Sequence, residues 1–239
     1  MVLGGMFVKW AYDLHIHTAA SPCGDENMTP HNIVNMSLLK GLDLIAITDH
    51  QTVANCEAVM KVGKAKGLRV IAGMELECME EFHMIALFPH IKAARDMEKW
   101  LGQFLPPIPN KPSIFGRQSI LNEEDECIGE IARLLLVAAN VAAEEILKKG
   151  RSLGALIYPA HIDRQSYSIL SNLGSIPQEY ALSYLEVSKA ASYTFYEKAY
   201  PGYTLIQSSD AHYLQDIAER EAYIEADILK HLVSNLDIS

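Results

Sequence analysis

Cysteine is scarce in this sequence, and its four cysteines are far apart. Cys23, Cys56, Cys78 and Cys127 form no C-x-x-C pair. This pattern argues against a disulfide framework and against a cysteine-rich zinc site, and it favours a reducing compartment. A chain of 239 residues can bury a large core, so it needs neither disulfides nor a metal merely to fold.

Long apolar runs are absent as well. No stretch approaches the roughly 18 apolar residues of a membrane span. The first nine residues, MVLGGMFVK, lack the apolar segment of a signal peptide. We therefore expect no membrane partner and a cytoplasmic location.

Positive charge is in short supply. The chain has 20 Lys and Arg against 30 Asp and Glu, a formal net charge of −10. Proteins that bind duplex nucleic acid usually carry a basic stripe, so this balance disfavours a duplex as partner. It leaves open a small anionic substrate or a short oligonucleotide, which a few local cations or metal ions can hold. Nothing in the pattern predicts an oligomeric state.

Strand-like runs alternate with helix-like segments over much of the chain. The short apolar runs typical of buried strands are residues 12–16, 44–47, 68–72, 83–88, 154–158, 184–187 and 204–207. Between them, Thr29 and Pro30 predict a helix start and Gly41 its end, and a second helix over residues 53–66 ends at Gly67. The alternation predicts an α/β fold with a mostly parallel sheet, open or closed into a barrel.

The middle of the chain departs from this rhythm. Residues 91–105 have a helical pattern, and residues 106–112 are too rich in proline for a helix or a central strand. The segment 130–147 carries a broad apolar face typical of a helix. We interpret residues 91–150 as a mainly helical insertion or lid within one domain of residues 1–239. A small second domain is the alternative.

His15 and His17 lie two residues apart on a predicted strand, so their side chains point to the same face. Such a pair alone is a weak signal for metal binding. Two strand-end histidines bonded to backbone or solvent would give the same pattern, so partners from elsewhere in the chain must decide.

Ligand-type residues recur at the ends of the other predicted strands, in the motifs T-D-H, G-M-E, P-A-H and S-D-A-H. The side chains concerned are His50, Glu75, His161, Asp210 and His212, joined by His83 at the start of another strand. In a parallel barrel, catalytic residues gather at the carboxyl-terminal rim of the strands, so we expect these side chains to meet. The remaining histidines, His31, His90 and His231, are interpreted as surface or capping residues.

The ligand types indicate the metal. Imidazole and carboxylate without thiolate suit Zn, Mn or Fe(II). Up to six histidines and two or three carboxylates exceed the needs of one ion, so two or three divalent ions are predicted. Glu75 is the candidate bridging ligand, because a carboxylate offers one oxygen to each of two ions. Such sites suit hydrolysis of phosphate esters, because they generate hydroxide at neutral pH and hold both the attacking and the leaving oxygen.

The motifs D-L-H-I-H-T, T-D-H, G-M-E, His83, P-A-H and S-D-A-H, in this order, resemble those of the PHP (polymerase and histidinol phosphatase) domain family. The resemblance covers about residues 11 to 225. It implies a distorted (β/α)7 barrel, here with a mainly helical insertion, and a trinuclear metal site that commonly hydrolyses phosphoesters.

The resemblance also implies how the ligands divide among the ions. The first ion would take His15, His17, Glu75 and Asp210, and the second His50, Glu75, His83 and His161. The third would take His212 and a residue of the loop 21-SPCGDENM-28, where this sequence is longer than the simpler family pattern. We favour Asp25 as that loop ligand, ahead of Glu26, with Cys23 as a further alternative.

Five other charged residues, four at the predicted rim and Arg117 in the insertion, complete the interpretation. Asp13 and Asp49 flank ligand histidines, and carboxylates in such places commonly orient imidazoles; for Asp13 a turn residue at the strand start is the alternative. Arg164 stands where family members with a phosphate substrate often carry a phosphate-binding Arg, which could grip phosphate with two N–H groups. Asp49 and Arg164 are the candidate catalytic residues. Lys189 and Arg117 are more simply explained as solvated surface charges.

These features together predict a metal-dependent phosphoesterase. Its substrate would be a small phosphorylated metabolite or a nucleotide, attacked by a hydroxide that bridges metal ions. One alternative is an exonuclease on short single-stranded DNA or RNA that uses the same site. Another is a non-catalytic metal-binding regulatory module.

Overall fold

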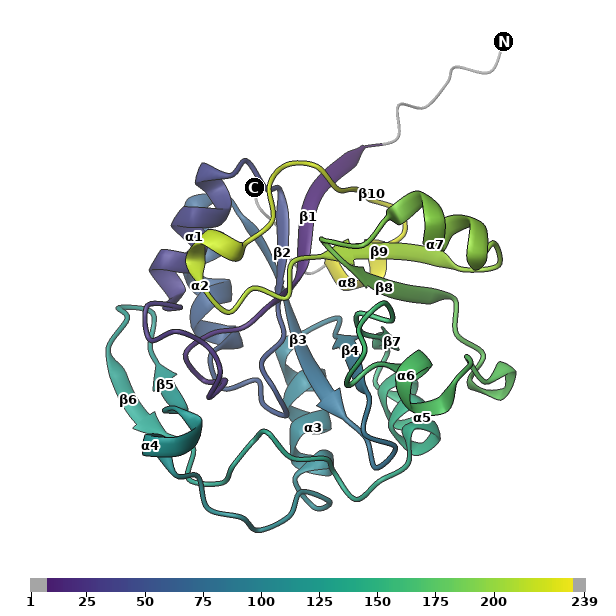
Figure 1. Ribbon diagram of the computed structural model, residues 1–239. Coiled ribbons are helices and arrows are strands. Elements are labelled where there is room, and N and C mark those ends of the chain that lie inside the picture. The colour runs from purple at the N-terminus through teal and green to yellow at the C-terminus, as the bar shows by residue number, and fades with distance from the viewer. Residues whose placement is uncertain (1–7, 234–239) are drawn as a thin grey trace.

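The structure is a computed structural model that describes residues 8–233. Its main sheet has the strand order β10-β1-β2-β3-β4-β7 and curls into half a barrel (Figure 1). The strands are β1 (Lys9–Ile16), β2 (Leu44–Ile47), β3 (Arg69–Glu77), β4 (His83–Leu87), β7 (Leu156–Pro159) and β10 (Tyr223–Glu225). A second sheet pairs β8 (Tyr184–Ser188) with β9 (Thr204–Ser208) in parallel. All seven predicted strand runs are confirmed as strands; β10, which pairs antiparallel with β1, was not predicted.

The pair β8–β9 lies between β7 and β1 without a continuous ladder to either. The backbone N of Leu14 donates to Ser208 Oγ at 3.3 Å, and Ile16 forms a single parallel bridge with Ala211. On the other side, Ile162 N donates to the carbonyl of Glu186 at 2.8 Å. The barrel is therefore distorted, as predicted, because side chains and isolated hydrogen bonds close it at two seams.

One interior strand of the main sheet, β4, runs against its neighbours, as β10 does at the edge. β1, β2 and β3 are parallel, whereas β4 is antiparallel to both β3 and β7. In this pairing His83, the first residue of β4, lies opposite Glu77 near the end of β3. The reversed strand therefore brings the start of β4 to the rim at which the parallel strands end.

The central strands β2, β3 and β4 are buried on both faces, which explains their near-continuous apolar composition. Successive residues of β2 alternate between two cores, because side chains along a strand point to opposite faces. Leu44 and Ala46 belong to the cluster inside the barrel, and Ile45 and Ile47 to the larger cluster under the helices. The barrel interior is thus filled with side chains and leaves only its rim for a site.

Helices cover the outer face of the sheet, with α1 and α2 on one flank and α5 (Ala143–Ser152) and α6 (Ile169–Leu173) on another (Figure 1). Thr29 caps α1 (Pro30–Leu39) as predicted, by accepting from Asn32 N, and Gly41 follows it with φ of 75°. The second predicted helix is α2 (Cys56–Lys66), which ends at left-handed Gly67. Within residues 8–233, no helix is long and apolar enough to cross a membrane.

The segment 91–150 is less helical than expected. It contains α3 (Ile91–Leu101), the short α4 (Pro112–Phe115), a hairpin of β5 (Ser119–Leu121) and β6 (Cys127–Glu130), and the start of α5 (Ala143–Ser152). The prediction of a helix over residues 130–147 was wrong up to residue 142. There the backbone bonds to other segments instead, as when Ile131 N donates to Gln118 O and Ala139 N to Glu77 O.

This segment packs against the loop that follows β1. Ser119 N donates to Ala19 O at 2.8 Å, and Asp125 accepts from the hydroxyl of Thr29 at 2.7 Å. Gly116 has φ of 99°, and a Cβ on it would lie 2.0 Å from the carbonyl oxygen of Pro22. The hairpin region is therefore in direct backbone contact with the loop that carries Cys23 and Asp25.

Candidate metal centre

The strand ends bring the histidine and carboxylate motifs together at one rim of the barrel. A pocket of about 310 Å³ opens there. Its lining includes Cys23, His50, Glu75, Glu77, His83, Leu136, His161, Arg164, Ser166, Tyr167, Asp210 and His212. Five imidazoles approach the carboxylate of the fully buried Glu75 within 3.4 Å, namely those of His15, His17, His50, His83 and His161.

The first possible metal group contains His15, His17, Glu75 and Asp210, whose ligand atoms all lie within 4.8 Å of one another. His17 Nε2 is 3.2 Å from His15 Nε2 and 3.1 Å from Asp210 Oδ1. His15 Nε2 is 3.2 Å from the same Asp210 oxygen. These four residues are the set that the family resemblance implied for the first ion.

Hydrogen bonds on the far side of each ring fix which nitrogen faces this group. His15 Nδ1 donates to Glu186 Oε1 at 2.8 Å. Ser21 Oγ donates its single proton to Asp49 Oδ1 at 2.6 Å, so it accepts from His17 Nδ1 at 2.9 Å. In the neutral rings both Nε2 lone pairs then face each other at 3.2 Å. That arrangement requires a proton or a cation between them, and it fits a divalent ion.

The second possible metal group contains His50, Glu75 and His83, and His161 lies beside it. His83 Nδ1 lies 2.8 Å and His161 Nε2 3.2 Å from Glu75 Oε1, and His50 Nδ1 lies 3.0 Å from Oε2. Glu75 Oε2 and His161 Nδ1 are buried and make no hydrogen bond with correct geometry. Because Glu75 belongs to both groups, one oxygen for each of two ions would satisfy it.

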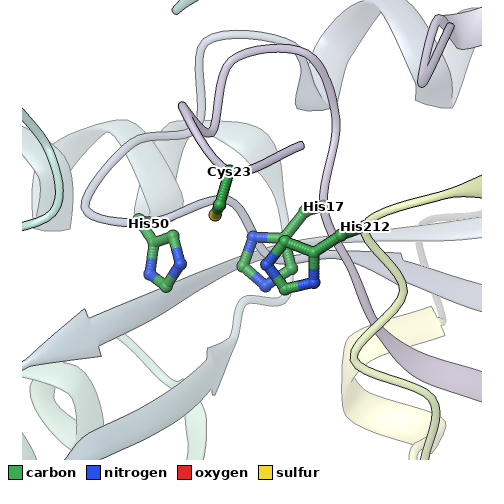
Figure 2. A group of neighbouring side chains, drawn as sticks. All are labelled: His17, Cys23, His50 and His212. Atoms are coloured by element: carbon green, nitrogen blue, oxygen red, sulfur yellow. The ribbon is translucent and has the colours of Figure 1, made fainter. Parts of the chain in front are cut away.

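A third group contains His17, Cys23, His50 and His212, with ligand atoms again within 4.8 Å of one another (Figure 2). His212 donates its Nδ1 hydrogen to the carbonyl of Asp210 at 2.9 Å, which leaves Nε2 as its free ligand atom. In Figure 2 the sulfur of Cys23 points toward the imidazoles of this group.

The structure does not bring Asp25, the favoured loop ligand, into this group. Asp25 Oδ1 instead accepts from the backbone N and from Nδ2 of Asn27, at 2.9 and 2.8 Å. This Asx turn prepares the chain for the helix start at Thr29. Glu26 is exposed. Cys23, the alternative of lowest rank, is the loop side chain that lies beside the histidines.

The buried charges shift the pKa values strongly in opposite directions. Desolvation lowers the pKa of His15, but the carboxylates of Glu186, Asp210 and Glu75 raise it well above its usual value. Desolvation acts similarly on His17, whose bonds to Asp210 and Glu75 outweigh it and raise its pKa to about 9. Burial would raise the pKa of Glu75, but the surrounding histidines hold it well below its usual value. The site thus keeps its carboxylates ionised and attracts cations.

The pKa values of His50 and His212, which line the pocket, shift downward instead. Burial lowers the pKa of His50, and burial together with the neighbouring His17 lowers the pKa of His212 to about 4. Burial, reinforced by the charge of Glu75, raises the pKa of the Cys23 thiol. Neutral imidazoles are the form that binds metals, so the side of His50 and His212 is ready to accept an ion.

Several ligand motifs adopt strained backbone. Gln51, His161 and Asp210 have φ of 55°, 27° and 53°, in the left-handed region that non-glycine residues seldom occupy. His161 and Asp210 are themselves candidate ligands, and Gln51 follows His50 directly. Strain of this kind persists where the surroundings enforce it and gathers at functional sites.

The candidate orienting acids do not touch the imidazoles. Asp49 is fully buried and accepts from Thr18 N, Thr18 Oγ1 and Ser21 Oγ, so it reaches His17 only through Ser21. Asp13 accepts from Ser209 and from Ala218 N. Both acids therefore anchor the loops that carry ligands.

The three candidate cations have different surroundings. Arg164 Nη1 pairs with Asp210 Oδ2 at 2.6 Å, and its side chain remains 44% exposed at the pocket. Lys189 donates to the carbonyl of Asp216, and Arg117 pairs with Glu130 on the hairpin. Neither Lys189 nor Arg117 lines the pocket.

Sequence reasoning missed Glu186, Ser21 and Tyr167. Glu186 is buried and holds both His15 Nδ1 and His161 N. A signal for it existed, because an acid in the middle of an apolar strand is seldom buried without a partner. The roles of Ser21 and Tyr167 depend on tertiary contacts, so no sequence motif indicated them.

Comparisons with known proteins agree on one family. The model of the PHP domain family matches residues 13–231. The uncharacterized protein MJ1587 of Methanocaldococcus jannaschii is 36% identical over 84 residues, 32% of this chain and 48% of that protein. A 5'-3' exoribonuclease of Haemophilus influenzae is 30% identical over 79 residues, 32% of this chain and 28% of the enzyme. The matched part is less than half the length of either relative.

Solved structures agree on the fold. The lesion-specific endonuclease PfuEndoQ from Pyrococcus furiosus superposes with a TM-score of 0.63 at 22% identity, over 86% of this chain and 49% of that one. An amidohydrolase from Chromobacterium violaceum superposes with a TM-score of 0.59 at 15% identity, over 90% and 91%. At these identities the likeness concerns the fold alone.

Proposed function

This chain belongs to the PHP domain family, and we propose that it is a phosphoesterase for small phosphate esters of nucleotide size. Metal-dependent phosphoester hydrolysis is the activity of the family. The membership supports an enzyme over a non-catalytic metal-binding module. The proposal concerns the substrate and the residues that handle it.

The proposed metal ligands are the clustered side chains at the rim. Glu75 would serve two ions, one beside His15, His17 and Asp210 and the other beside His50 and His83. His161, 3.2 Å from Glu75 Oε1, would join the second ion. Bound divalent ions would supply a water of lowered pKa and positive charge for the phosphate oxygens. Glu186 and Ser21 would keep the Nδ1 hydrogens of His15 and His17 on their outer sides, and thereby the Nε2 lone pairs turned inward.

Arg164 is proposed to bind the phosphate. It is the only Arg or Lys among the residues that line the pocket in the described part of the chain. Its Nη1 is engaged by Asp210, which holds the guanidinium beside the first metal group. The remaining N–H groups could bind two oxygens of one phosphate in the fork geometry that suits Arg.

Tyr167 is proposed to contact the leaving group. Its ring stacks on His83 with the centroids 4.9 Å apart, it lines the pocket, and the residue is 51% exposed. Its φ of 54° is an outlier for a bulky residue, and its carbonyl accepts from His83 N at 2.9 Å. A nucleobase or a similar flat group could stack on the free face of this ring.

The single cation in the pocket is the observation that carries the preference for a small substrate. A long polynucleotide needs several phosphate contacts, and a net charge of −10 repels its remaining phosphates. One phosphate beside Arg164, with one flat group on Tyr167, matches a nucleotide or a metabolite of that size.

An exonuclease acting on short single strands is the second candidate. One observation favours it: the relatives from Haemophilus influenzae and Salmonella typhimurium are named 5'-3' exoribonucleases. The terminal nucleotide of an oligomer would then occupy the same pocket. In that case hydrolysis of oligomers should fall with rising salt, while hydrolysis of mononucleotides should not.

The test is a panel of phosphate esters assayed with Zn²⁺, Mn²⁺ and Fe²⁺. It should include nucleoside mono- and bisphosphates, non-nucleotide phosphomonoesters and short oligonucleotides. Arg164→Gln should raise KM for the preferred substrate, whereas Arg117→Gln, a matched exposed arginine outside the pocket, should not. Oligonucleotides turned over faster than every mononucleotide would replace the small-ester proposal by the exonuclease. Equal rates for wild type and His50→Ala would refute the assignment of this centre to catalysis.

A further inference from the structure

The loop after β1 holds Cys23 in a defined place. Its turn is closed by Gly24 N donating to Ser21 O at 2.9 Å, and the next residue, Asp25, donates its N–H to the carbonyl of His212 at 2.9 Å. A Cβ on Gly24 would lie 2.4 Å from the carbonyl oxygen of Thr18. The backbone on both sides of Cys23 is thus fixed by close contacts, one of them to the segment that carries His212.

The thiol lies among metal-ligand atoms. Cys23 Sγ and one ring nitrogen each of His17, His50 and His212 lie within 4.8 Å of one another. In a tetrahedral zinc site with one sulfur and several nitrogens, ligand atoms are about 3.3–3.6 Å apart, as follows from zinc–ligand bonds of about 2.0–2.3 Å. Separations within the group therefore need to shrink by at most about 1.2–1.5 Å when an ion binds.

The nitrogens of His17 are already engaged elsewhere. Nδ1 donates to Ser21, and Nε2 faces His15 and Asp210 in the first group. That leaves three ligands for a separate ion, namely the sulfur of Cys23 and one nitrogen each of His50 and His212. His50 Nδ1 lies 3.0 Å from Glu75 Oε2, so its Nε2 is the nitrogen assigned to this ion. Three protein ligands and an open fourth position are the arrangement of catalytic zinc sites, and Cys23, His50 and His212 all line the pocket.

We propose that the thiolate of Cys23 is a metal ligand, completing with His50 and His212 a sulfur-containing site beside the Glu75 groups. The inference rests on the metal centre proposed above and adds the class of ion that it selects. On binding, the thiol proton is released to solvent and the sulfur bonds to the ion. Thiolate favours zinc, iron or cobalt over the manganese and magnesium that prefer oxygen.

The first experiment is alkylation of the full chain by iodoacetamide, with peptide mapping of each cysteine by mass spectrometry. Zn²⁺ should slow the labelling of Cys23 by about tenfold or more, as expected for a coordinated sulfur. Cys127, which is exposed and outside the possible metal groups of residues 8–233, is the internal control and should label at the same rate with and without Zn²⁺. Mn²⁺ should protect Cys23 much less than Zn²⁺.

The second experiment detects the sulfur–metal bond itself. Titration of metal-free protein with Co²⁺ should produce a near-ultraviolet sulfur-to-cobalt charge-transfer band in the wild type. The band should be missing in Cys23→Ser and retained in Cys127→Ser and Asp25→Asn. Asp25→Asn tests the rival loop ligand, since the amide oxygen preserves the turn to Asn27 and removes the charge.

The outcomes separate this inference from the proposed function. An unchanged cobalt band in Cys23→Ser, or its loss in Asp25→Asn alone, would overturn the thiolate ligand even in a protein that hydrolyses phosphate esters. A band that depends on Cys23 in a protein without hydrolysis of any ester would support the ligand and refute the proposed function.

Discussion

Ser21 is the residue through which the metal centre can be tested without changing a ligand. Its side chain is fully buried. Its oxygen donates to Asp49 and accepts from His17 Nδ1 and His50 N, at 2.6, 2.9 and 3.1 Å. Ser21→Ala removes all three bonds and leaves a volume close to that of serine.

The expected loss of stability depends on which hydrogen bonds each partner of Ser21 keeps after the substitution. Asp49 retains two bonds from Thr18, whereas His17 Nδ1 and His50 N lose a partner inside the protein. At about 1–2 kcal/mol for each group left unpaired, metal-free Ser21→Ala should lose about 2–4 kcal/mol of stability. For a chain of this size that lowers the melting temperature by about 5–15 °C.

Metal affinity should fall as well, because nothing then fixes the hydrogen of His17 on Nδ1. Loss of such an outer partner typically weakens a metal site by about 10- to 100-fold. Thermal unfolding of the metal-free protein measures the first effect, and Zn²⁺ titration against a coloured chelator measures the second. Ser37→Ala is the matched control, since Ser37 is equally buried and its hydroxyl only donates to the helical carbonyl of Ile33. Equal effects of the two substitutions on both measurements would refute the reasoning.

Three further predictions concern the same centre. Glu186→Gln should weaken Zn²⁺ binding by about 10- to 100-fold in the chelator titration. The control is Glu197→Gln on the exposed α7 (Tyr193–Ala199), which should leave the affinity unchanged. Unchanged affinity in Glu186→Gln would mean that Glu186 does not orient His15. Tyr167→Ala should raise KM for a nucleotide more than for a non-aromatic phosphate ester in steady-state assays, and equal changes for both would remove the stacking role. The pKa of His17 is raised from 6.5 to about 9, so its contribution to metal-free stability is complete below pH 6.5 and is lost as the pH rises toward 9. The melting temperature should therefore fall over this range without metal and change little with bound Zn²⁺; parallel curves for the two forms would contradict this.

Much of the fold was predictable because the strands are short, apolar and buried on both faces. The helix starts and ends at Thr29, Gly41 and Gly67 were readable for a similar reason, since capping is local chemistry. Residues 131–142 were not, because their apolar pattern suits a helix while their backbone groups find partners on Gln118 and Glu77. A tertiary contact overrode the local preference there.

The histidine motifs were predictable as a group because each stands at a strand end, and strand ends of a barrel meet. The loop residue beside them was not. Ligand chemistry favoured a carboxylate, and Asp25 lies only two residues from Cys23, but Asp25 forms a local turn with Asn27. Which side chain reaches the histidines depends on the fixed backbone around Gly24, and this geometry leaves no periodic signal in the sequence.

The three metal groups differ in what holds their ligands. Most ligands of the first two groups stand on the strands or directly at their ends, where the barrel fixes them. Cys23 stands on a loop that contacts the segment 112–130. Gly116 packs against the carbonyl of Pro22, and Asp125 accepts a hydrogen bond from the hydroxyl of Thr29. A Cβ on Gly116 would meet the Pro22 carbonyl at 2.0 Å, so even alanine there must displace the loop. The hairpin region therefore governs the geometry of the third group, whereas the Glu75 groups depend on the barrel.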